Sequence, residues 1–328
     1  MILEQMTDSQ THSQENMQDQ FLPAAITDTG CERELNEDRY AVIESPVGIV
    51  WLICDGMGGV SGGELAAQLA IDSMRRVLES SEGRTPEEAL RLAIKEANRV
   101  IVLRRQNQAF AQMGTTIVGA IFSEREVVLG NVGDSRAYLV RAGAIQQLSR
   151  DHTFVQELVD RGELAPDEAL SHPKAHVLTR AIGAEPALEV EVKRYWQWDT
   201  SAGEVDSLVL CSDGLYSHVN DAEIAQIVSE FSPQRACAKL TELAKQRGGY
   251  DNITVAIIPL QGQVKKEAPA GYQEKLAKSR KKNLATVARK TKVKKFSGSA
   301  LWWLLLISGL SLVAVVVAVL GVVVLANS

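Results

Sequence analysis

The chain has 328 residues, a hydrophobic content of 45% and a formal net charge of -6. This hydrophobic content is ordinary for a folded protein and excludes a wholly disordered chain. The acidic balance argues against a dedicated nucleic-acid binder, which would carry a basic surface, so we expect no nucleic-acid partner. The length fits one large domain or two small ones.

The cysteines and histidines exclude further classes of protein. No cysteine belongs to a CxxC pair, which argues against a disulfide scaffold and a cysteine-rich zinc module and suits a reducing compartment. The histidines form no HExxH motif, so a zinc hydrolase is not expected. The cysteines are Cys31, Cys54, Cys211 and Cys237.

The chain begins with a polar, glutamine-rich stretch that lacks the basic and apolar regions of a signal peptide. We expect a disordered leader over residues 1–20, followed by a folded body. Short apolar runs in that body, separated by polar turns, predict β-strands. The predicted strands are Gly48–Cys54, Thr115–Phe122, Val127–Val132, Arg136–Val140, Ser207–Ser212 and Ile253–Leu260.

Amphipathic stripes and capping signals predict helices between these groups of strands. The sequence from Thr85 to Glu88 is a capping box with proline at the first helical position, so a helix begins there. Two antiparallel sheets with helix pairs outside them would cover every apolar face, so we predict an α+β fold, a four-layer αββα sandwich. The other predicted helices are Glu64–Leu78, Asp221–Glu230 and the segment from Ser232 through Gln246.

The C-terminal part of the chain differs sharply in charge from the body. Residues 265–295 contain twelve basic and two acidic side chains, which leaves 23 basic and 39 acidic side chains for the rest of the chain. Such a difference in charge indicates that this part of the chain has a function separate from that of the body. We expect residues 263–299 to be a basic juxtamembrane linker.

The segment Ala300–Ala326 contains no charged residue and is dominated by leucine and valine. About 20 apolar residues suffice to cross a bilayer. Trp302 and Trp303 stand at the start of the segment, where aromatic rings favour the membrane interface. A buried core helix is the alternative, but it would show an amphipathic pattern. We predict a transmembrane helix over residues 300–326 that contacts membrane lipid.

The basic linker sets the expected orientation of this helix. Lysine and arginine clusters stay on the cytoplasmic side of a membrane. We therefore expect a single-pass protein of the cell's inner (plasma) membrane, with the folded body in the cytoplasm. The predicted domains are the leader 1–20, the body 21–262, the linker 263–299 and the span 300–326.

Carboxylates at the ends of the predicted strands carry the chemical signal. Asp55 and Asp213 each follow an apolar run and precede glycine, and Asp251 directly precedes another run. A single Asp-Gly pair is usually a turn, but two copies after buried strands weaken that interpretation. Asp38 and Asp134 stand in polar turns. An all-oxygen cluster of this kind suits Mg²⁺ or Mn²⁺.

Seven short motifs appear in order along the body. Together they resemble the metal-dependent serine/threonine protein phosphatases, the PPM or type 2C family, in its bacterial form. The resemblance covers roughly residues 24–260 and implies an αββα fold. The motifs are Arg33 to Asp38, Asp55 to Gly59, Met113 to Thr116, Gly133 to Arg136, Asp151 to Thr153, Ser212 to Gly214, and Asp251-Asn252.

The resemblance implies a centre of two Mn²⁺ or Mg²⁺ ions, with a third, weaker ion. Asp55 would bridge the first two ions, and Asp134 would bind the third. Glu37 and Asp38 would support the second ion directly or through water. Asn252 would orient Asp251 from outside the metal shell. The implied ligands are Glu37, Asp38, Asp55, Gly56, Asp134, Asp213 and Asp251.

The resemblance also implies the reaction. A water activated by the ions would attack phosphorus while the serine or threonine oxygen leaves. Arg33 and Asp55 are the predicted catalytic residues, because Arg33 would grip the phosphate with its planar fork. Some family members carry a histidine where this chain has Met57, and methionine cannot donate a proton. His152 is a candidate general acid by chemistry, and a structural histidine in a turn is the favoured alternative.

Three functions remain open at this point. The first is a membrane-tethered phosphatase that acts on phosphorylated proteins at serine and threonine and opposes a serine/threonine kinase. The second is a catalytically weak phosphoprotein-binding or scaffold module of the same fold. The third is a phosphohydrolase for small phosphate esters.

Overall fold

The computed structural model describes residues 22–58, 62–123, 126–196 and 206–260. Contacts between Cα atoms divide the chain into two units, Met1–Val264 and Lys265–Ser328, and all described residues belong to the first. The predicted leader, basic linker and membrane span lie outside the described residues. Within the described ranges, no helix has both the length and the hydropathy that crossing a membrane requires.

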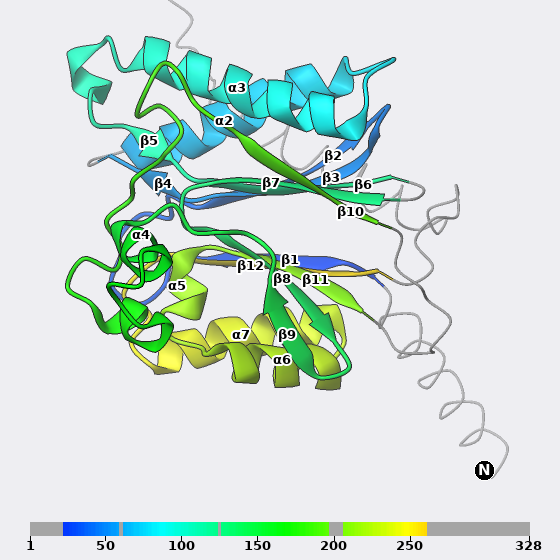
Figure 1. Ribbon diagram of the computed structural model, residues 1–328, viewed down its shortest axis with the longest axis vertical. Helices are drawn as coiled ribbons and strands as arrows, with labels where there is room; N and C mark the ends of the chain where they lie inside the picture. The colour runs from blue at the N-terminus through cyan, green and yellow to red at the C-terminus, as the bar shows by residue number, and fades with distance from the viewer. Residues whose placement is uncertain (1–21, 59–61, 124–125, 197–205, 261–328) are drawn as a thin grey trace, which may run out of the picture. The chain divides into compact units, whose positions relative to one another are not determined.

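Two five-stranded antiparallel sheets form the centre of this unit (Figure 1). All strand pairs in both sheets are antiparallel, as predicted. The first sheet has the order β1 (Ala24–Asp28), β12 (Ile253–Pro259), β11 (Ser207–Cys211), β8 (Arg136–Arg141) and β9 (Ala144–Gln147). The second has the order β10 (Glu191–Trp196), β7 (Glu126–Val132), β6 (Ile117–Phe122), β3 (Gly48–Cys54) and β2 (Arg39–Ser45).

A pair of long helices covers the outer face of each sheet (Figure 1). Helices α2 (Gly62–Glu79) and α3 (Pro86–Arg104) cover the second sheet, and α6 (Asp221–Glu230) and α7 (Pro233–Gln246) cover the first. The predicted capping box is present at the start of α3. Thr85 Oγ1 accepts a hydrogen bond from Glu88 N, and the Glu88 carboxylate accepts one from Thr85 N.

Alternation along the strands divides the apolar side chains among three core layers. In β3, Val50 and Leu52 pack toward α2 and α3, whereas Trp51 and Ile53 pack toward the other sheet. Both faces of the strand are therefore buried, which explains why its sequence is a continuous apolar run. The same division holds in β11 and β12. These layers confirm the predicted α+β sandwich of two antiparallel sheets between helix pairs.

One predicted strand is wrong as a single element. The run Thr115–Phe122 divides at Thr116 into β5 (Gly114–Thr115), which pairs with β4 (Gly56–Met57), and β6. Thr116 leaves the ladder because its backbone N–H donates to Asp55 O at 2.8 Å and its Oγ1 accepts from Asp55 N at 3.0 Å. The interruption therefore holds the predicted metal ligand Asp55 in place.

The predicted site residues lie at one end of the sandwich. Strands β3 and β7 are both antiparallel to β6 and therefore end at the same edge of their sheet. In the other sheet, the end of β11 pairs with the start of β12. Figure 1 shows three short elements at this end: β4, α4 (Phe154–Asp160) and α5 (Asp213–Tyr216).

Candidate metal centre

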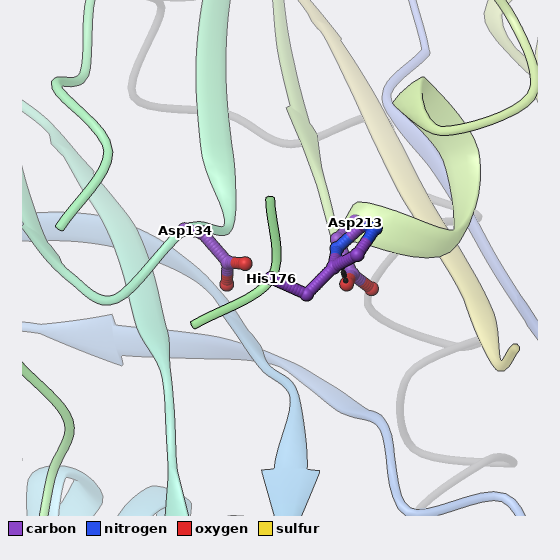
Figure 2. A group of neighbouring side chains, drawn as sticks. All are labelled: Asp134, His176 and Asp213. Carbon is purple, nitrogen blue, oxygen red and sulfur yellow. Dashed lines mark ion pairs between the residues drawn. The ribbon is translucent and has the colours of Figure 1, made fainter. Parts of the chain in front are cut away.

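Three side chains from separate segments converge at this end of the sandwich. Asp134 follows β7, Asp213 opens α5, and His176 belongs to the segment 153–179. One ligand atom from each lies within 4.8 Å of the others, and Figure 2 shows the group. His176 Nδ1 is 3.2 Å from Asp213 Oδ2. The sequence analysis predicted the two aspartates and missed the histidine.

Asp55 lies among four other predicted ligands. Its carbonyl oxygen accepts from Thr115 Oγ1 at 2.9 Å, in addition to the two backbone contacts with Thr116. The pKa of its carboxyl is raised well above the usual value, first by burial and then by repulsion from neighbouring carboxylates. Those neighbours are Asp38, Asp213, Asp134 and Asp251. The structure therefore brings together the aspartates that the sequence analysis predicted.

Glu37 and Asp38 are adjacent in sequence but lie in different surroundings. Asp38 is fully buried, and its Oδ2 accepts from Ser212 Oγ at 2.7 Å. Burial raises the pKa of Asp38 to about 7, although hydrogen bonds from Thr254 and Ser212 oppose the shift. Glu37 Oε1 instead accepts from Gly63 N at 3.0 Å, at the beginning of α2, where a helix favours negative charge.

Gly56 allows the chain to pass close to this acidic pair. A Cβ atom added at Gly56 would lie 2.2 Å from Gly63 O and 2.7 Å from Glu37 O. No side chain fits into that space. The predicted ligand Gly56 therefore keeps its backbone against the acidic pair and the start of α2.

Arg33 and Asp251 form an ion pair at the exposed rim. Arg33 Nη2 lies 2.9 Å from Asp251 Oδ2, and the Arg33 side chain is 51% exposed. The Asn252 backbone N–H donates to Asp251 Oδ1 at 2.8 Å. The Asn252 side chain binds the backbone of Thr29, Leu35 and Glu37. Asn252 thus orients Asp251 through its backbone, while its side chain fixes the loop that carries Arg33 and Glu37.

His152 supports the backbone next to Asp134. It is buried, its side-chain Nδ1 accepts from Gly133 N at 3.1 Å, and its backbone N–H donates to Gly133 O at 2.9 Å. Burial, together with Arg180 and Arg150, lowers the pKa of His152 to about 4, so the imidazole is neutral near pH 7. These contacts favour the structural interpretation of His152 over the general-acid one.

A stacked pair beneath Asp134 is a second feature that the sequence analysis missed. The Tyr216 hydroxyl donates to Asp134 O at 3.0 Å, and the Arg136 guanidinium lies 3.7 Å from the centre of the Tyr216 ring. Arg136 also makes several hydrogen bonds to the Asp151 carboxylate at 2.7–3.1 Å. Burial strengthens such charge-assisted contacts. They fix the backbone position of Asp134. The motifs that contain Arg136 and Asp151 were identified in the sequence, but their contact with each other and with Tyr216 was not predicted.

The centre has the properties of a divalent-cation site. Asp38 Oδ1 and Asp213 Oδ1 are buried and have no hydrogen-bond partner. Within the described part of the chain, Arg33 is the one lysine or arginine side chain that pairs with these carboxylates. Buried negative charge without a partner is costly, and oxygen donors are the ligands that Mg²⁺ and Mn²⁺ take. The residues present therefore fit the ions that the sequence analysis predicted.

The shifted pKa of Asp38 predicts how pH affects the metal-free protein. A carboxyl whose pKa rises from about 4 in the unfolded chain to about 7 in the folded one stabilises the fold at low pH. That stabilisation is lost as pH rises through this window. We expect Asp38→Asn to gain thermal stability over the natural chain progressively from about pH 4 to about pH 7, because asparagine never ionises.

Thermal unfolding in a chelator checks this prediction. Comparing the two proteins at each pH cancels the contribution of groups that do not interact with Asp38, including His152, whose lowered pKa acts in the opposite direction below about pH 6.5. With Mn²⁺ present, the order should reverse, since the ion binds the ionised carboxylates. A stability difference that does not change with pH in chelator would contradict the assigned environment of Asp38.

Comparison with known proteins agrees with the resemblance found in the sequence motifs. The family model for protein phosphatase 2C matches residues 32–246. The serine/threonine phosphatase stp of Listeria monocytogenes serovar 1/2a is 37% identical over 243 residues, which cover 71% of this chain and 93% of the relative.

Solved structures agree with the sequence match. The crystal structure of the Mycobacterium tuberculosis serine/threonine phosphatase PstP/Ppp has a TM-score of 0.65 and 34% identity, and covers 72% of this chain and 97% of that one. The catalytic domain of PstP in complex with two manganese ions has a TM-score of 0.63 and 32% identity, and covers 72% and 96%. The chain therefore belongs to the protein phosphatase 2C family of metal-dependent serine/threonine phosphatases.

Proposed function

We propose that this chain is a membrane-tethered phosphatase that removes phosphate from phosphoserine and phosphothreonine in proteins and opposes a serine/threonine kinase. The observation that carries the catalytic part is the group of partly buried aspartates around Asp55, whose charge the protein leaves almost uncompensated. A site of this charge needs divalent cations, and the chain carries the acidic residues that its resemblance to the family assigns to them.

Different residues of the centre would bind the ions and the substrate. When bound, two divalent ions supply an activated water and offset the charge of the phosphate. Asp55 would hold both ions, Asp213 and Asp251 would hold the first, and Glu37 and Asp38 would support the second directly or through water. The Gly56 carbonyl would contribute to one of these two sites, and Asp134 would belong to a third, weaker site.

Arg33 is the group that we assign to the phosphate. Its side chain is half exposed and is anchored to the centre at Asp251, so the guanidinium stands at the rim of the acidic cluster. The planar fork can bind two phosphate oxygens in parallel, and it stays charged at any physiological pH. Arg33 would thereby attract a dianion toward a site that the aspartates alone would repel.

The alternatives are a catalytically weak binding module and a phosphohydrolase for small esters. A binding module has no need of the uncompensated carboxylates, which destabilise the metal-free fold. A direct test is a Mn²⁺-dependent assay of residues 22–262 on phosphothreonine and phosphotyrosine peptides, and on nucleotides. Turnover of the phosphothreonine peptide alone supports the proposal, preference for nucleotides supports the small-ester enzyme, and binding without turnover supports the module.

The C-terminal segments support the tethered part of the proposal from sequence alone. The uncharged stretch 300–326 is long enough to span a bilayer, and the basic stretch before it favours the cytoplasmic leaflet. Each lysine or arginine near anionic lipid contributes about 1 kcal/mol of attraction. Tethering would raise the effective concentration of the enzyme toward phosphoproteins of the same membrane, including a membrane kinase.

Removing the C-terminal segments separates the effect of membrane tethering from the catalytic activity of the body. We expect a chain that ends at Gly262 to be soluble and to hydrolyse a small phosphopeptide at the rate of the full chain, because all predicted ligands precede that point. The same chain should act poorly on membrane-embedded phosphoproteins in cells. Peptide assays in vitro and phosphoprotein levels in cells measure the two effects. A folded truncated chain that is inactive on the peptide would contradict this division.

A further inference from the structure

We infer that His176 is a nitrogen ligand of the third cation site and completes it with Asp134 and Asp213. A transition-metal ion bound there would fasten the segment Thr153–Thr179 to the metal centre. This inference rests on the metal-dependent function proposed above and adds a ligand that the family motifs do not contain. It makes the site selective for Mn²⁺ over Mg²⁺.

The contacts between the three side chains fit a shared ion. The 3.2 Å separation of His176 Nδ1 and Asp213 Oδ2 is close to the roughly 3 Å that separates adjacent ligands of an ion with bonds of about 2.1 Å. Asp134 is only 4% exposed, and its carboxylate has no ion pair among the described residues. Asp213 Oδ1 is also buried without a partner. Both aspartates thus keep donor atoms available to a cation (Figure 2).

Backbone contacts hold His176 in position for this role. Phe154 N donates to Val177 O at 2.8 Å, and Thr179 N donates to His152 O at 2.8 Å. These bonds close the base of the segment on either side of α4 and of the short helix η2 (Pro166–Ser171). His152 in turn binds both backbone polar groups of Gly133, the residue before Asp134. His152 therefore links the segment that carries His176 to the backbone beside Asp134. The hydrogen bonds at the base of this segment hold His176 in position.

An imidazole changes the metal preference of an otherwise carboxylate site. Mg²⁺ takes oxygen ligands in a strict octahedron and keeps much of its water, whereas imidazole binds transition metals readily. A site with two carboxylates and one imidazole therefore favours Mn²⁺ over Mg²⁺. Loss of the imidazole should weaken Mn²⁺ binding at this site by about tenfold or more, since even removal of partners outside the metal shell costs this much. Mg²⁺ binding should change little.

Pulsed electron paramagnetic resonance on the Mn²⁺-loaded full chain tests the inference directly. Nitrogen bound to Mn²⁺ produces a hyperfine coupling, and ¹⁵N-labelled histidine identifies its source. We expect a histidine coupling in the natural chain, its loss in His176→Ala and in His176→Gln, and its retention in His172→Ala. His172 is a matched control because it lies in the same segment but its Nδ1 accepts from Lys174 N. The Gln variant retains a polar side chain beside Asp213, and thermal unfolding verifies that each variant folds.

Two results would overturn the inference. One is a natural chain without histidine coupling when all Mn²⁺ sites are filled, and the other is a coupling that persists in both His176 variants. In either case His176 is only a hydrogen-bond partner of Asp213. Failure of the proposed function would give a different result. If the chain shows the histidine coupling but does not hydrolyse the phosphopeptide, His176 is still a metal ligand and the proposed phosphatase function is wrong. Mn²⁺ titrations of the same variants should show the tenfold weakening in the His176 variants alone.

Discussion

Asp55→Asn is expected to lower kcat/KM on a phosphothreonine peptide by about 10³-fold or more, which corresponds to roughly 4 kcal/mol of transition-state stabilisation. Asp55 is the residue assigned to both principal ions, so the substitution weakens two sites at once. An amide is a poorer ligand than a carboxylate for a hard cation. The backbone contacts of Asp55 with Thr115 and Thr116 do not involve its side chain, so the local structure should persist.

The same substitution should stabilise the metal-free protein. Burial and four neighbouring carboxylates raise the pKa of Asp55, which means that its charge is unfavourable in the folded state without metal. Asparagine removes this repulsion, and each kcal/mol gained raises Tm by about 2–4 °C for a domain of this size. Mn²⁺ should then raise the Tm of the variant much less than that of the natural chain. A gain in stability combined with a loss of activity is the expected signature of a ligand, not of a structural residue.

Asp72→Asn is a matched control for this experiment. Asp72 is an exposed carboxylate on α2 that accepts a hydrogen bond from Gln68 at 2.9 Å, and it lies outside the acidic cluster. Its substitution should change neither turnover nor the Tm gain on adding Mn²⁺. Full turnover by purified Asp55→Asn protein would refute the assignment of Asp55 to both ions.

The sequence predicted best those elements whose signals are local. Strand β3 and helix α6 have the predicted ends, because a buried apolar run stops at Asp55 and an acidic first turn opens the helix at Asp221. The Asp-Gly pairs correctly indicated carboxylates at strand ends. Their convergence followed from the family motifs, since the sequence alone does not say which strand ends meet.

The elements that were missed depend on distant partners. Strand β1 is short and only partly buried, and it exists because it pairs with β12, where Asp28 lies opposite Ile253. Strand β2 mixes polar and apolar residues at a sheet edge, so its pattern is weak. His176 stands in a polar segment without a local motif, and its contact with Asp213 spans 37 positions in the sequence. Only the closed base of that segment brings it to the centre.

Arg33→Ala is expected to raise KM for a phosphothreonine peptide by about 10- to 100-fold, because each charge-assisted hydrogen bond contributes about 1.5–3 kcal/mol. The loss of kcat should be secondary, since Arg33 provides no ligand atom for a cation and the acidic cluster remains. Arg33→Lys keeps the charge but loses the planar fork, so its KM should lie between those of the natural chain and the alanine variant.

Because Arg33 forms an ion pair with Asp251, Mn²⁺ binding by the Arg33→Ala variant is a second informative measurement. Arg33 lowers the pKa of Asp251 against the stronger opposing effects of burial and Asp213, so the pH dependence of Mn²⁺ binding should move to higher pH in the alanine variant. Arg99→Ala is the matched control, because Arg99 is an exposed arginine on α3 that pairs with Glu96 at 2.7 Å. Its KM and Mn²⁺ binding should not change. If KM for the phosphopeptide is the same in Arg33→Ala and the natural chain, the phosphate does not contact Arg33, and the half-exposed guanidinium serves only to hold Asp251.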